Sequence, residues 1–169
     1  MKTPFCPRCG MRTVPALIDG RQREQCPACA HVVYRNPAPV ALAVVNHGGK
    51  LLLVRRALEP LEGHWAPPGG YVECGESLLE AAIREVREET ALEIRIDGLI
   101  GAYSQSDVDV IIVGYRAHSI AGEPQAGDDA TELSLFERGQ LPFEPVSNSA
   151  PPIDKWFGEV IQEVTAAWR

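Results

Sequence analysis

Residues 70–92, GYVECGESLLEAAIREVREETAL, contain the pattern from which the rest of the fold can be inferred. Ser77 and Glu80 fit a capping box, and the apolar residues after them recur at helical spacing, which predicts a helix over about 78–90. At about 100° per residue, Glu85, Glu88 and Glu89 fall on one face of that helix. Like charges at these spacings repel by roughly 0.2–0.5 kcal/mol per pair. The crowding of three acids therefore needs a physical explanation.

A bound divalent cation explains this crowding better than a solvated charged face. The three carboxylates flank the apolar stripe of the helix instead of lying opposite it, and Arg84 offsets part of the repulsion through its i,i+4 partners Glu80 and Glu88. Carboxylate oxygens without Cys or His favour Mg²⁺ or Mn²⁺. Gly69 and Gly70 would let the backbone approach a ligand or the metal closely, although a plain turn is the alternative.

The same 23 residues resemble the signature of the Nudix hydrolase family, Gx5Ex7REUxEExGU, in which U is an apolar residue. One specified position departs, because the last Gly of the signature is Ala91 here. A left-handed helix exit would cost a non-Gly residue roughly 1–2 kcal/mol, so we expect the departure to affect the helix exit and not the chemistry. The matching residues are Gly70, Glu76, Arg84, Glu85, Val86, Glu88, Glu89 and Leu92.

The resemblance implies an α/β fold, a Nudix α/β/α sandwich with a mixed sheet, over residues 37–169. Short apolar runs predict strands at 40–45, 51–54, 94–96, 99–104, 108–116 and 132–136. A second helix is expected over about 151–168, with its apolar residues on one core-facing side. Residues 64–76 are rich in Pro and Gly and are expected to form a loop.

The resemblance also implies a reaction, in which water attacks the pyrophosphate of a nucleoside diphosphate linked to another moiety. The implied roles are metal binding by Glu85, Glu88, Glu89 and the Gly70 carbonyl, orientation of a glutamate by Arg84, and support of this group by Glu76 and Gly69.

A general base in this family often comes from outside the signature. Glu132 is the first candidate for a base or an extra ligand, with Asp128 and Asp129 as alternatives, and a solvated acid at a strand entry is the other interpretation of Glu132. Arg55 and Arg56 end a predicted strand and are candidates for phosphate binding, although exposed arginines are common.

Four of the five cysteines predict a zinc ribbon. Cys6 and Cys9 form one C-x2-C pair, Cys26 and Cys29 form another, and 16 residues separate the pairs. This spacing lets two tight turns present four thiolates to one tetrahedral Zn²⁺, and such a closed site is structural. Two disulfides are the alternative, but the absence of an export signal disfavours them. Pro37 then favours an extended connection, so we place the ribbon at 1–36 and the Nudix domain at 37–169.

A four-cysteine ribbon before the catalytic domain is similar to that of a Nudix subset that includes NADH pyrophosphatases and smaller enzymes acting on ADP-ribose or FAD. This implies ADP-ribose or a FAD-like dinucleotide as substrate, with AMP released. The NADH branch carries a motif like SQPWPFPxS, whereas this chain has only YSQSD at 103–107, which argues against NADH as the main substrate. Two alternative functions remain. One is a pyrophosphatase that removes unwanted nucleoside triphosphates, and the other is a nucleotide-sensing module whose ribbon contacts a partner.

The charge of the chain is divided unevenly. The net charge is −7, and residues 1–35 carry six basic and two acidic residues, which leaves −11 for the remainder (−7 − 4). Four thiolates with Zn²⁺ would lower the first segment to about +2. Binding to nucleic acid is therefore not expected, and a homodimer is an expectation drawn from relatives. No apolar run approaches the ~20 residues of a membrane helix, so we expect a soluble cytoplasmic protein.

Overall fold

The chain folds into two compact units, Met1–Asn36 and Pro37–Arg169. The computed structural model describes residues 5–127 and 130–168. Within these ranges, no helix is long and apolar enough to cross a membrane.

The first unit is a small antiparallel sheet in the order β1-β2-β3. β1 (Val14–Ile18) and β2 (Arg21–Gln25) form a hairpin, and β3 (Val32–Val33) pairs with the end of β2. The two turn residues Asp19 and Gly20 both have positive φ, 50° and 74°, as a two-residue hairpin turn of type I′ requires. The two C-x2-C knuckles lie before β1 and between β2 and β3.

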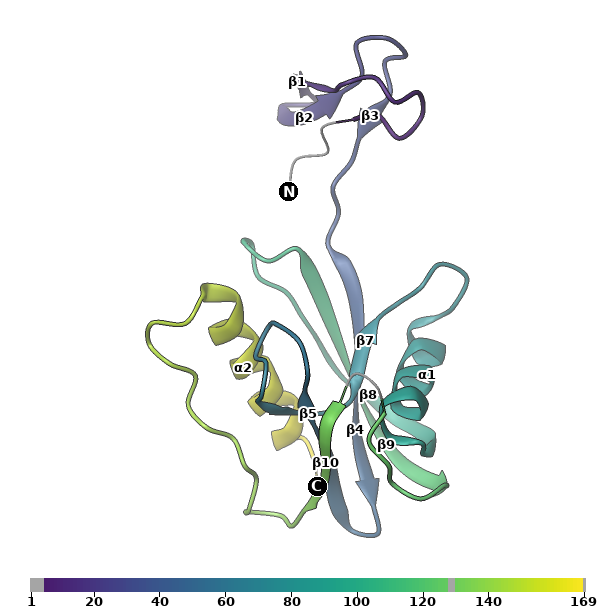
Figure 1. Ribbon diagram of the computed structural model, residues 1–169, viewed down its shortest axis with the longest axis vertical. Coiled ribbons are helices and arrows are strands. Elements are labelled where there is room, and N and C mark those ends of the chain that lie inside the picture. The colour runs from purple at the N-terminus through teal and green to yellow at the C-terminus, as the bar shows by residue number, and fades with distance from the viewer. Residues whose placement is uncertain (1–4, 128–129, 169) are drawn as a thin grey trace. The chain divides into compact units, whose positions relative to one another are not determined.

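The second unit is built on a seven-stranded mixed sheet with the main order β10-β5-β4-β9-β8 (Figure 1). β4 runs parallel to β9, and the other strand pairs are antiparallel. The strands are β4 (Ala38–His47), β5 (Lys50–Arg56), β6 (Trp65–Ala66), β7 (Gly69–Tyr71), β8 (Glu93–Tyr103), β9 (Val110–Ala121) and β10 (Ala130–Phe136).

One helix covers each face of this sheet, which gives the expected α/β/α layers (Figure 1). α2 (Pro152–Ala166) packs on the face that carries Val40, Leu42 and Val44 of β4. α1 (Leu78–Thr90) packs on the opposite face, over the alternate residues Ala41, Ala43 and Val45. Because successive side chains of a strand point to opposite faces and both faces are covered, residues 40–45 of β4 must all be apolar.

α1 has the bounds and the capping box that the sequence predicts. The Ser77 hydroxyl accepts the backbone N–H of Glu80 at 3.3 Å, and the Glu80 carboxylate accepts that of Ser77 at 2.7 Å. Ala91 ends the helix in the left-handed conformation, with φ 57° and ψ 14°. The chain therefore keeps the helix exit expected of Gly, at the steric cost of a Cβ.

Two expectations were wrong in detail. The segment 64–76 is not only loop, since β6 pairs with β5 and β7 pairs with β4. Isolated two- and three-residue strands have too few side chains to show a period. The strands expected at 94–96 and 99–104 form one strand, β8, whose register against β9 shifts at three points and so interrupts the alternation of apolar residues.

Candidate metal and substrate site

Arg84 joins Glu76, Glu85 and Glu88 into one hydrogen-bonded group. Its Nε and Nη2 donate to the two carboxylate oxygens of Glu76 at 3.0 and 2.7 Å. Its Nη1 donates to Glu85 at 2.8 Å and to Glu88 at 2.9 Å, and Nη2 also donates to the carbonyl of Tyr71 at 3.0 Å. All five N–H donors of the guanidinium are therefore used. Glu80, expected to share Arg84, is instead taken by the helix cap.

Glu76 and Arg84 stabilise each other's charged form. Hydrogen bonds from Arg84, and then one from the backbone N–H of Glu73, lower the pKa of Glu76 to about 2. The pKa of Arg84 is raised, mostly by its hydrogen bonds to Glu76. Desolvation opposes this shift, and the hydrogen bonds to Glu85 and Glu88 add to it. The Glu85 side chain is only 14% exposed, so its charge depends on such partners.

β7 brings two glycines against the glutamates of α1. The backbone N–H of Gly69 donates to Glu89 at 3.0 Å. A Cβ placed on Gly70 would lie 2.5 Å from a carboxylate oxygen of Glu85, so only Gly leaves space there. A Cβ on Gly69 would overlap the carbonyl oxygen of Ala41. The strand pairing of β7 with β4 is what fixes this close approach.

Glu85 and Glu89 line a cavity of about 370 Å³ together with Gly69, Gly70 and Arg56. The rest of the lining is largely apolar and includes side chains that the sequence did not single out. They come from strands and from α2, whose apolar face was interpreted as core alone: Val40, Leu42, Val54, Val110, Ile112, Ile153 and Phe157.

Arg56 is a fixed cation inside this cavity. Its Nε donates to the carbonyl of Pro60 at 2.6 Å, and its guanidinium carbon lies 5.0 Å from the centre of the Phe157 ring. Desolvation lowers the Arg56 pKa, and the charge of Glu89 opposes this shift. Arginine remains protonated even so, which makes Arg56 suited to an anionic group.

Arg55 and Glu132 lie together, away from the lining of that cavity. Arg55 Nη1 and a Glu132 carboxylate oxygen are 3.3 Å apart, on the paired strands β5 and β10, and both side chains are about half exposed. Arg55 Nε also donates to the carbonyl of Gly63 at 2.8 Å. Arg55 lines a second cavity of about 560 Å³ between the 61–65 loop, residues 141–146 and α2. Asp128 and Asp129 lie outside the described residues.

The acidic residues fit a metal that is completed by water and substrate. Among residues 5–127 and 130–168, only the cysteines form a group of three or more potential ligands within 4.8 Å of one another. Glu85, Glu88 and Glu89 are thus less tightly converged. Mg²⁺ usually takes one or two carboxylates together with waters and phosphate oxygens, so this looser donor set and the space left by Gly70 suit it.

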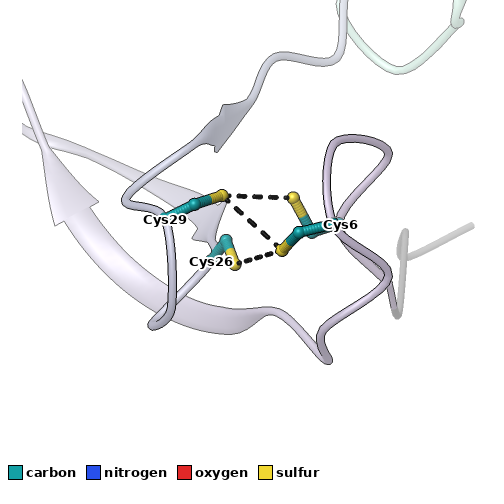
Figure 2. Close-up of side chains that lie close together, drawn as sticks. Cys6, Cys26 and Cys29 are labelled. Atoms are coloured by element: carbon teal, nitrogen blue, oxygen red, sulfur yellow. Dashed lines mark hydrogen bonds between the residues drawn. The ribbon is translucent and has the colours of Figure 1, made fainter.

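The four thiols of the first unit have the spacing of a tetrahedral zinc site. Sulfur–sulfur distances are 3.7 Å for Cys6–Cys29, 3.5 Å for Cys9–Cys26 and 3.7 Å for Cys9–Cys29. Four Zn–S bonds of ~2.3 Å in a tetrahedron place the sulfur atoms about 3.8 Å from one another. Figure 2 shows the labelled side chains of Cys6, Cys26 and Cys29 turned toward one another.

The thiols also influence one another's ionisation. Desolvation raises the Cys26 pKa, but backbone N–H groups of Cys29 and Ala28 and neighbouring thiols lower it to about 7. The backbone N–H of Met11 lowers the Cys9 pKa, but the thiols of Cys26 and Cys29 outweigh it and raise the value to about 12. A cation bound among the sulfurs would favour the deprotonated form of all four thiols.

Comparisons with known proteins agree with the geometry. Residues 35–157 match the model of the NUDIX domain. The chain is 40% identical over 114 residues to the ADP-ribose pyrophosphatase of Methanocaldococcus jannaschii, covering 65% of this chain and 68% of that protein. It is 31% identical over 147 residues to the NAD-capped RNA hydrolase NudC of Pseudomonas aeruginosa, covering 86% of this chain. The chain spans only 51% of the length of that hydrolase.

A solved structure resembles nearly the whole chain. The crystal structure of a NUDIX hydrolase from Nitrosomonas europaea has a TM-score of 0.80 and 26% identity, and covers 99% of this chain and 94% of that one. The domain match, the α/β/α fold and the acid-bearing helix α1 lead to one conclusion: this chain belongs to the Nudix hydrolase family.

Proposed function

We propose that this protein hydrolyses the pyrophosphate bond of ADP-ribose or a FAD-like dinucleotide and releases AMP. The observation that carries the proposal is the cavity in which Glu85, Glu89 and Arg56 meet an apolar wall. Such a cavity offers a place for phosphates at its charged side and for an uncharged part of the substrate at its apolar side. The relative with 40% identity is an ADP-ribose pyrophosphatase, which supports the same substrate class.

Glu85, Glu88, Glu89 and the Gly70 carbonyl would hold Mg²⁺ or Mn²⁺, which when bound polarises phosphate oxygens and lowers the pKa of bound water. Arg84 keeps Glu85 and Glu88 at fixed positions through its Nη1. Glu76 in turn fixes Arg84 by a two-point contact, which restricts the guanidinium more than a single bond would.

Arg56 is the better of the two arginines for contacting the substrate phosphates. It lines the cavity of Glu85 and Glu89, and its guanidinium is anchored by the Pro60 carbonyl. Arg55 is occupied by Glu132 and Gly63. We therefore assign phosphate binding to Arg56 and a supporting contact to Arg55.

Glu132 remains our candidate for the general base. Its ion pair with Arg55 would hold the carboxylate in one position on β10. The pH dependence of kcat tests the assignment, because Glu132→Gln should remove the acidic limb of the profile while leaving the protein folded. An unchanged profile in the variant would rule Glu132 out as base.

NAD-derived substrates are a second candidate class. The 147-residue match to the NAD-capped RNA hydrolase is longer than the second unit, so it extends into the ribbon. NADH and a short NAD-capped RNA therefore belong in the same assay. A preference for either over ADP-ribose would replace our first assignment.

The experiment is a substrate panel with the full chain and Mg²⁺, in which AMP and the other products are separated by chromatography. The panel contains ADP-ribose, FAD, NADH, NAD-capped RNA and nucleoside triphosphates. We expect AMP from ADP-ribose or FAD, and loss of turnover in Glu85→Gln. Release of inorganic pyrophosphate from triphosphates would favour the clean-up alternative, and no turnover of any compound would overturn the proposal.

The zinc, the assembly and the location of the protein also stay proposals. We expect one structural Zn²⁺ on Cys6, Cys9, Cys26 and Cys29, which metal analysis of the purified chain measures. We further expect a homodimer without bound nucleic acid, which light scattering and a gel shift test, and a cytoplasmic location, which fractionation tests.

A further inference from the structure

The last turn of α1 holds Glu88 and Glu89 where a helix is least favourable to negative charge. The C-terminal end of a helix carries the negative end of its dipole, and its last four carbonyls have no partner within the helix. Helix ends also open more readily than helix middles. Carboxylates that must keep one geometry at this end need support from outside the helix.

Residues 122–127, between β9 and β10, provide backbone donors at this end. The N–H of Gly127 donates to the Glu89 carbonyl, and the N–H of Gln125 donates to the Thr90 carbonyl, both at 2.9 Å. Residues 122–127, which follow β9, can be followed beside α1 in Figure 1. The two last carbonyls of α1 thus have partners from a segment more than 30 residues later in the chain.

Two of the preceding carbonyls, those of Val86 and Arg87, are satisfied locally. The N–H of Ala91 donates to the Arg87 carbonyl at 2.9 Å, and the Thr90 hydroxyl donates to the Val86 carbonyl at 2.6 Å. The end of α1 is therefore held by its own exit residue and by the 122–127 segment together.

Two glycines allow the segment to lie this close. A Cβ on Gly127 would overlap the carbonyl oxygen of Glu88. A Cβ on Gly122 would lie 2.5 Å from the carbonyl oxygen of Ala91, and Gly122 has a φ of +95°. Both obstructing atoms belong to the backbone, so neither can move aside as a flexible side chain would.

We propose that residues 122–127 act as a clamp that positions Glu88 and Glu89 for the divalent metal, with Gly127 as the positioning residue. The inference rests on the metal-binding role given to these glutamates above. The clamp acts through the backbone of Glu89, whose carboxylate is held at its other side by the N–H of Gly69. Releasing the clamp leaves the ligands present but less well ordered.

The test compares Gly127→Ala with the wild-type chain by Mn²⁺ titration, followed by electron paramagnetic resonance. Loss of one hydrogen bond and of local order should raise the dissociation constant for Mn²⁺ about three- to tenfold. Amide hydrogen exchange within residues 84–92 should become faster, while the exchange of β4 stays unchanged.

Gly98→Ala is the matched control, because its Cβ would lie 3.6 Å from the Arg116 side chain in ordinary contact. It should bind Mn²⁺ like the wild type. Gln125→Pro removes the N–H that reaches Thr90 and is a second variant if Gly127→Ala does not fold. Gln125→Ala keeps that N–H and should have no effect.

An Mn²⁺ affinity that is unchanged in Gly127→Ala and Gln125→Pro would overturn the clamp, whether or not amide exchange becomes faster. Failure of the proposed function is a separate result. In that case the wild-type chain would bind Mn²⁺ no better than Glu85→Gln. The clamp proposal would then be wrong as well, because it rests on metal binding by these glutamates.

Discussion

Replacing Arg84 by Lys tests the hydrogen-bonded acidic group most directly. The substitution keeps the positive charge but reduces five N–H donors in a planar fork to three on one ammonium. At least two of the five bonds to Glu76, Glu85, Glu88 and Tyr71 must therefore be lost.

The expected cost follows from burial. Arg84 is 25% exposed, and its partners Glu76 and Glu85 are 16% and 14% exposed, so water replaces the lost bonds poorly. Hydrogen bonds to charged groups contribute about 1.5–3 kcal/mol each, and partial access of solvent reduces this, so we expect the free energy of unfolding to fall by about 2–4 kcal/mol. We expect kcat/KM to fall about 10–100-fold, as when the residues that orient metal ligands are changed.

The assay is urea unfolding in EDTA, followed by tryptophan fluorescence. All three tryptophans, Trp65, Trp156 and Trp168, lie in the second unit, so the signal reports on the Nudix domain. Arg87→Lys is the matched control, because Arg87 also makes two bonds, of 2.6 and 2.7 Å, to one carboxylate, that of Glu93.

The control pair is exposed, with side chains 56% and 43% accessible, and should contribute little to stability. Arg87→Lys should therefore change neither stability nor activity appreciably. Equal unfolding midpoints for the two variants would refute the reasoning that the buried fork stabilises the site.

Four further predictions concern the helix exit, the acid range, the cavity and the ribbon. Ala91→Gly should raise the free energy of unfolding by about 1 kcal/mol, measured by urea unfolding, because it relieves a left-handed Ala. The contribution of Glu76 to stability should be complete above its unfolded pKa of about 4.5 and be lost as the pH falls toward 2, which acid titration of Glu76→Gln against wild type measures. Arg56→Ala should raise the KM for ADP-ribose about tenfold or more in steady-state kinetics, since a fixed cation is lost from the cavity. Cys29→Ser should abolish the tight binding of one Zn²⁺, measured with a chromophoric chelator.

Much of the fold was readable from local patterns. The bounds of α1 follow from Ser77 and Glu80, whose reciprocal hydrogen bonds depend only on residues three apart. The apolar face of α2 follows from its 3.6-residue period, and the cysteine cluster follows from two identical spacings. In contrast, β6 and β7 exist only because longer strands offer them edges to pair with.

The candidate site shows the same division. The sequence by itself determined which residues carry charge on one face of α1, since a helix places i, i+3 and i+4 neighbours together wherever it folds. The sequence could not show that Arg56 lines the cavity while Arg55 pairs with Glu132. Two adjacent residues acquire different surroundings only once β5 packs against its neighbours. The sequence also could not show that residues 122–127 hold the end of α1, since hydrogen bonds between backbone groups far apart in the chain leave no side-chain pattern. The chemistry of the proposed ligands is therefore local, whereas their positioning was decided by the tertiary structure.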